Sequence, residues 1–143
     1  MRSGSVVLLG SLAVACTVLP ARPAQAGEQV EGMIEHNRSL MKILETNVSL
    51  CKKAFRKVKA YHKKNAADFA RKKKQTRAYL RQLSPADQRR FTRQYASRVQ
   101  DMVMELLPTS LKFQENCPKQ TLKLADTFHD FDMAMDSEHE HGH

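Results

Sequence analysis

Apolar residues recur every three or four positions along much of this chain. The pattern is clearest within residues 33–84, which contain no glycine or proline. There the apolar stripe runs through Met41, Leu44, Val48, Cys51, Phe55, Val58 and His62. This spacing is typical of one face of an amphipathic helix. A weaker continuation reaches Leu83, so we expect helical structure from about residue 29 to residue 82.

The helical stretch can be divided in two ways. A highly charged run at residues 71–77 interrupts the apolar pattern. A single uninterrupted helix would be roughly 80 Å long, which is long for a small domain. Of the two interpretations, one continuous helix or two helices, we favour two that meet in a bend or short turn near Lys64-Asn65.

The second half of the chain is also helical in pattern. Ser84 can cap a helix, Pro85 suits its first position, and Asp87 complements its positive end. This helix is expected to stop before Pro108, and Thr109 or Ser110 begins a short helix ending at Asn116. Pro118 then opens a last helix, with the apolar residues Leu122, Leu124, Ala125, Phe128 and Phe131.

The fold class is therefore all-α, because no strand-like alternation of polar and apolar residues is found. We predict a small helical bundle, or an extended helical hairpin assembly, of about four main helices and a short fifth segment. Its single domain is expected to span residues 27–135. The polar residues 136–143 have no apolar face and are expected to form a disordered His/Glu tail.

The first 26 residues are typical of a secretory signal peptide. Arg2 precedes an apolar run at residues 6–19, and Ala24-Gln25-Ala26 forms a cleavage site of the A-x-A type. The run is shorter than the roughly 20 apolar residues of a membrane span. We expect removal of residues 1–26 and a periplasmic or secreted protein. A lipoprotein attached through Cys16 is the alternative, since Cys16 follows Ala13-Val14-Ala15.

Export decides how the two remaining cysteines are interpreted. In an oxidising compartment an isolated pair usually forms a disulfide, so we predict a Cys51–Cys117 bond. Two free buried thiols are the alternative. No C-x-x-C motif is present, which gives no support to a thioredoxin-like site or to covalent haem attachment.

Charge is strongly segregated along the chain. Residues 51–100 contain 17 Lys or Arg and two acids, a net charge of +15, whereas residues 126–143 contain six acids and no Lys or Arg. Such a basic region attracts acidic or unfolded polypeptide or anionic envelope lipid, and nucleic acid is not expected for an exported protein. The alternative is a merely solvated helix face. The candidate basic face comprises Lys52, Lys53, Arg56, Lys57, Arg71, Lys72, Lys73, Lys74, Arg77, Arg89, Arg90 and Arg93. Reversal of the charges at residues 72, 73, 74 and 77 is expected to leave the helices intact.

The C-terminal tail is the best candidate for a metal site. His139, His141 and His143 alternate with other residues, and such imidazoles can together bind Cu, Ni or Zn. The M-x-M pairs at residues 102–104 and 133–135 are better explained as core filling. No cofactor is otherwise implied, and His36 and His62 are interpreted as core or boundary residues. Because the common catalytic motifs are absent, we expect no enzyme activity.

One short element resembles a known family. Leu83-Ser84-Pro85-Ala86-Asp87-Gln88 is similar to the Leu-Thr-x-x-Gln element of the Spy/CpxP family of periplasmic helical chaperones, although Gln88 is one position late and no second copy follows. The resemblance implies client binding or envelope-stress sensing without ATP, on a basic concave surface.

The sequence thus predicts an exported, non-enzymatic helical binding protein of the cell envelope, with a chaperone-like role as its most specific form. A periplasmic metal-binding protein acting through the tail is one alternative, and a structural envelope protein is another. A homodimer remains open.

Overall fold

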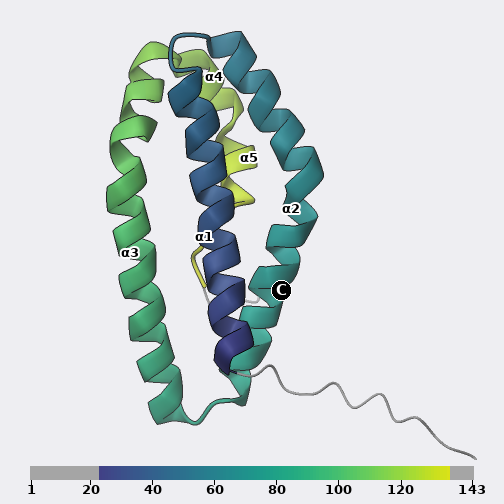
Figure 1. Cartoon of the computed structure of the whole chain (residues 1–143), viewed down its shortest axis with the longest axis vertical. Coiled ribbons are helices and arrows are strands. Elements are labelled where there is room, and N and C mark those ends of the chain that lie inside the picture. The colour runs from purple at the N-terminus through teal and green to yellow at the C-terminus, as the bar shows by residue number, and fades with distance from the viewer. Residues whose placement is uncertain (1–22, 136–143) are drawn as a thin grey trace, which may run out of the picture.

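The computed structural model describes residues 23–135, and within that range its only regular secondary structure is helical. Three long helices, α1 (Pro23–Thr46), α2 (Cys51–Gln82) and α3 (Pro85–Asn116), are followed by the short helices α4 (Pro118–Lys123) and α5 (Ala125–His129). The predicted all-α fold is confirmed. Figure 1 shows α1 between α2 and α3, with α4 at one end of the bundle.

The core is built around α1, which packs mainly on α2 and secondarily on α3, while α2 and α3 touch each other little. From α1, the fully buried residues Met33, Ile34, Leu40 and Leu44 point into this core. Burial of an aliphatic side chain contributes about 1.5–3 kcal/mol. Helix α1 is therefore the element on which both α2 and α3 pack.

The first break in the helices lies at residues 47–50, and the predicted bend near Lys64-Asn65 is wrong. Asn47 is buried, and its side-chain amide donates to the Ile43 carbonyl at 2.8 Å. This local bond competes with continuation of the helix. Asn65 also donates to the carbonyl four residues earlier, that of Tyr61, at 3.0 Å, but there the helix continues through it.

Helix α3 passes through Pro108, so the expected stop before this residue and the separate short helix ending at Asn116 are wrong. Proline removes one backbone hydrogen bond, here the one to the carbonyl of Met104. Pro108 and Met104 both lie on the exposed side of α3. The freed carbonyl is on the solvent side, where water can replace the lost donor. The predicted start of α3 is confirmed, because the Ser84 hydroxyl accepts from the Asp87 amide.

The predicted disulfide is confirmed. Cys51 and Cys117 are bonded, with their Cα atoms 5.4 Å apart and 66 positions between them in sequence. Cys51 begins α2 and Cys117 follows the last residue of α3. The bond therefore joins the start of one long helix to the end of another, at the end of the bundle where α4 lies (Figure 1).

The expected last helix is divided in two at Leu124, and Leu122, one of its apolar residues, is 79% exposed. Val103 of α3 is also exposed. After α5, residues 130–135 contain no helix; we call them the C-terminal strap. Three side chains bind the strap's backbone carbonyls: Asn37 that of Phe131, Lys73 that of Asp132, and Tyr95 that of Met133.

Several predictions fall outside the described residues. The apolar run at residues 6–19, Cys16 and the tail at residues 136–143 belong to this group. The expected cleavage site itself lies within the described residues, but the apolar run before it does not. Helix α1 begins at Pro23, so Ala24-Gln25-Ala26 lies in its first turn, and Ala26 is buried. Among the helices within residues 23–135, none has the length and hydropathy needed to cross a bilayer.

Candidate anion-binding face

Most of the basic charge is carried by a single helix. Helix α2 contains 13 Lys or Arg and one acid, Asp68. By contrast α1 contains four acids and two bases, and α3 contains four acids and five bases. The positive region found in the sequence is therefore mainly one face of α2, with little opposite charge on the same helix.

Ten of the 13 basic residues of α2 are solvent-exposed. At about 100° per residue they fall within an arc of about 160° on one side of the helix, and they extend over roughly 45 Å of its length. We call this set the basic stripe. Its members are Lys52, Lys53, Arg56, Lys57, Lys59, Lys63, Lys64, Arg71, Lys74 and Arg81.

Three predicted members of the basic face point elsewhere. Lys72 extends across Gly32 of α1, where an added Cβ would lie 2.5 Å from its Cε, and its Nζ donates to Asp68 at 2.6 Å. Lys73 donates to the Asp132 carbonyl at 2.5 Å. Arg77 is half-buried, with its Nε inaccessible. Reversing these charges would disturb these contacts, which argues against using this variant to test binding without loss of structure.

The remaining predicted residues, Arg89, Arg90 and Arg93, are exposed near the start of α3. Arg90 lies 3.8 Å from Asp87, an exposed contact that adds little stability. Arg89 and Arg93 line a shallow hollow with Gln88 and Thr92. These arginines follow α2 directly after the turn at residues 83–84, so they extend the positive region beyond the end of α2.

Sequence reasoning missed a polar cluster between α1 and α2. His36 lies 2.8 Å from the Asp68 carboxylate through Nε2 and 2.6 Å from the Tyr61 hydroxyl through Nδ1. Asp68 also accepts from Lys72 and Arg71. Hydrogen bonds from Lys72, His36 and Arg71 hold the pKa of Asp68 well below its usual range. Burial raises the pKa of Tyr61, and its hydrogen bond with Ser39 opposes that increase.

This cluster links α1 to α2 through paired polar side chains. The side chain of His36 is only 12% exposed, and both of its ring nitrogens have partners. Because a hydroxyl can donate or accept, Tyr61 satisfies Nδ1 in either protonation state of the ring. The spacing of Asp68 from Arg71 and Lys72, three and four residues, was visible in the sequence. Its contact with His36, 32 positions earlier, was not.

Replacement of Asp68 with Asn is expected to lower the free energy of unfolding by about 1–2 kcal/mol at pH 7, a value discounted because the carboxylate is one-third exposed. A lowered pKa stabilises the fold above the unfolded value of about 3.9, and this stabilisation is lost as the pH falls toward the folded value. The difference from wild type should therefore be full above about pH 5 and shrink below pH 4. Urea unfolding across this range measures it. Asp101→Asn, the same change at an exposed acid, is the control, and an equal effect of both would contradict the assignment.

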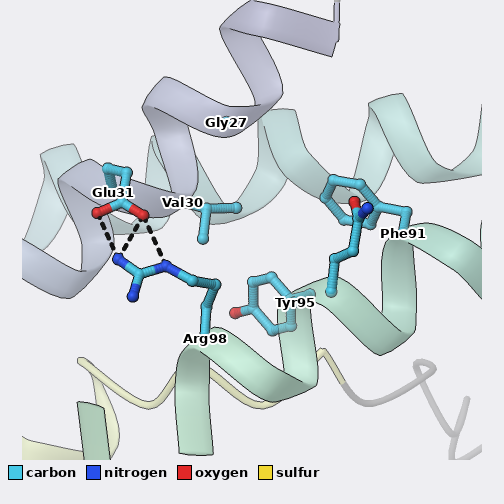
Figure 2. A pocket seen from close by; sticks show the side chains of 7 residues that line it. Gly27, Val30, Glu31, Phe91, Tyr95 and Arg98 are labelled. Carbon is cyan, nitrogen blue, oxygen red and sulfur yellow. Dashed lines mark hydrogen bonds and ion pairs between the residues drawn. The ribbon is translucent and has the colours of Figure 1, made fainter. Parts of the chain in front are cut away.

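A second feature is an apolar hollow of about 190 Å³ between α1 and α3, shown in Figure 2. Val30, Phe91 and Tyr95 line it with Gly27. At its margin Arg98 binds the Glu31 carboxylate, with a shortest distance of 2.6 Å. Burial raises the pKa of Tyr95, whose hydroxyl donates to the Met133 carbonyl. The lining charges are thus paired with each other.

The described residues do not test the predicted metal site. His139, His141 and His143 lie outside the described residues, and within residues 23–135 no three His, Cys, Asp or Glu side chains are grouped to hold a metal ion. Met102 and Met133 are buried, and Met104 is exposed. His62 is a partly exposed boundary residue that pairs with Asp130 at 2.7 Å.

The fold and the basic stripe define a disulfide-linked helical bundle with one strongly basic helix. Comparison of the chain with protein-family models, with curated proteins and with solved structures found no match.

Proposed function

We propose that this protein is an exported, non-enzymatic binding protein of the cell envelope that holds acidic, unfolded polypeptide on the basic stripe, with a chaperone-like role. The observation that carries this proposal is the lack of neutralisation along the stripe. Seven of its ten residues form neither an ion pair nor a side-chain hydrogen bond with any described residue: Lys52, Lys53, Arg56, Lys57, Lys63, Lys64 and Lys74.

The form of the stripe supports an extended client. It is long and convex rather than a cavity, so its partner is recognised by charge along a chain and not by shape. A single exposed ion pair is worth at most about 1 kcal/mol, so useful affinity requires several contacts at once. The resemblance of residues 83–88 to the Spy/CpxP element supports client binding, but the convex stripe differs from the concave surface that the resemblance implies.

Binding is expected to depend on salt and on the centre of the stripe. The wild-type protein should be retained on immobilised polyglutamate at low salt and released near 1 M salt, where the Debye length falls to about 3 Å. A variant with Arg56→Glu, Lys63→Glu and Lys74→Glu should bind at least about tenfold more weakly, since three favourable contacts become repulsive. All three residues are exposed, so circular dichroism should show unchanged helicity.

The matched control carries the same change in net charge elsewhere. Lys42, Lys112 and Lys119 are exposed and lie outside α2, and their replacement with Glu should reduce retention much less. Equal loss in both variants would mean that only net charge matters. Absence of retention at low salt would show that the stripe is only a solvated surface. The alternative of a structural envelope protein would then be preferred.

A further inference from the structure

Three of the four exposed leucines within residues 23–135 lie at the end of the bundle that contains the disulfide; the fourth, Leu107, lies farther along α3. Leu50 is 51% exposed and immediately precedes Cys51. Leu111 is 49% exposed and lies six residues before Cys117, and Leu122 is 79% exposed and lies five residues after it. At 1.5 Å per helical residue, both are within about 10 Å of Cys117 along the helix axes. The disulfide joins these two segments, so the three leucines share what we call the disulfide end (Figure 1).

Lysines are interspersed with these leucines. Lys52 and Lys53 follow Leu50, Lys112 follows Leu111, and Lys119 and Lys123 are on α4 with Leu122. All five are exposed, and none forms an ion pair within the described part of the chain. The exposed acids near this end are Glu45, Glu115 and Asp126, fewer than the five lysines. The disulfide end is therefore positive as well as apolar.

This combination favours one kind of partner. An acidic soluble polypeptide would satisfy the lysines but would leave the leucines in water. A purely apolar protein surface would bury the leucines but would desolvate the lysines without compensation. The interface of an anionic bilayer satisfies both, because leucines enter the acyl boundary while ammonium groups remain among lipid phosphates.

We propose that the disulfide end docks on the surface of an anionic lipid bilayer. Leu50 and Leu122 insert, and the neighbouring lysines bind the headgroups. Because α2 runs from this end toward the opposite end of the bundle, end-on docking leaves the later part of the basic stripe, from Lys63 to Arg81, away from the lipid (Figure 1). This inference goes beyond the proposed function: it places the protein at a membrane surface with the later part of the basic stripe still accessible to polypeptide.

The test uses the oxidised protein and vesicles of phosphatidylcholine and phosphatidylglycerol in equal amounts, followed by sedimentation. Wild type should partition to these vesicles and only weakly to pure phosphatidylcholine. The variant Leu50→Ser, Leu122→Ser should partition at least about tenfold more weakly, since each insertion removes apolar area from water. Val103→Ser, Met104→Ser is the matched control, because these residues are 46% and 65% exposed on α3 but lie about 20 Å from Cys117 along the helix.

The outcomes separate this inference from the proposed function. Equal partitioning of wild type and the Leu50/Leu122 variant, equal loss in the Val103/Met104 control, or no vesicle binding by wild type would each overturn the docking surface. The Leu50/Leu122 variant should keep its retention on polyglutamate. Failure of polyglutamate binding in wild type, with vesicle binding intact, would instead overturn the proposed function alone.

Discussion

Reduction of the Cys51–Cys117 disulfide is expected to lower the free energy of unfolding by about 4 kcal/mol. In the chain-entropy model, stabilisation increases with the number of residues in the closed loop, from about 3 kcal/mol for 15 residues to about 4.7 for 100. The 66-position separation here falls between these values. The loop encloses all of α2 and α3, so the bond restricts most of the unfolded chain.

Urea unfolding with and without reductant measures this effect. The variant Cys51→Ala, Cys117→Ala is the control for the reductant, and its stability should match that of reduced wild type and not respond to reductant. Alanine is preferred to serine because Cys117 is only 1% exposed, and a buried hydroxyl would add a separate cost. A loss below about 1 kcal/mol would show that the helical ends are held together by packing alone.

The fold class was predictable because periodicity reports which residues face a core, but it does not report where the chain turns. Val48 and Cys51 continue the apolar stripe of α1 across the turn at residues 47–50. The stripe persists because α1 and α2 bury their apolar sides in the same core. Asn47 was the visible sign of the turn, yet a mid-chain Asn was equally visible at Asn65, where the helix continues.

Pro108 and Leu122 show a second limit of prediction from the sequence. A proline normally predicts a helix end, but its cost depends on whether the freed carbonyl meets water, which only the orientation of α3 decides. The sequence pattern groups Leu122 with the other apolar residues of a single last helix. The break at Leu124 separates it from Phe128 and Phe131, so the leucine is left in solvent.

The positive charge of the candidate site was readable from composition, but the orientation of each basic side chain was not. Within the run at residues 71–77, Lys74 is exposed while Lys72 and Lys73 are used in packing. Their partners are Asp68 on the same helix and Asp132 on the distant C-terminal strap. A contact between residues 59 positions apart, such as that of Lys73 with Asp132, produces no periodic pattern in the sequence. The sequence therefore could not show which residues of this charged run are exposed and which make structural contacts.

Phe131→Ala is expected to lower the free energy of unfolding by about 3–5 kcal/mol. Phe131 is 1% exposed and, with Met133, is where the C-terminal strap enters the core. Its ring centroid lies 5.3 Å from that of Phe69 and 5.9 Å from those of Tyr61 and His62. Such ring pairs add to the free energy of burial. The substitution leaves a cavity between α1 and α2 that these larger side chains cannot fill.

Urea unfolding of Phe131→Ala and wild type measures the loss, with Leu122→Ala as the control. Leu122 is 79% exposed, so its removal should change stability by less than about 0.5 kcal/mol. Both variants keep the disulfide, so any difference between them arises from packing by the strap. The carbonyl of Phe131 still accepts from Asn37 after the substitution, so the strap's backbone bond remains. A loss below about 1 kcal/mol for Phe131→Ala would show that the bundle is stable without the strap, and that residues 130–135 rest on the core instead of completing it.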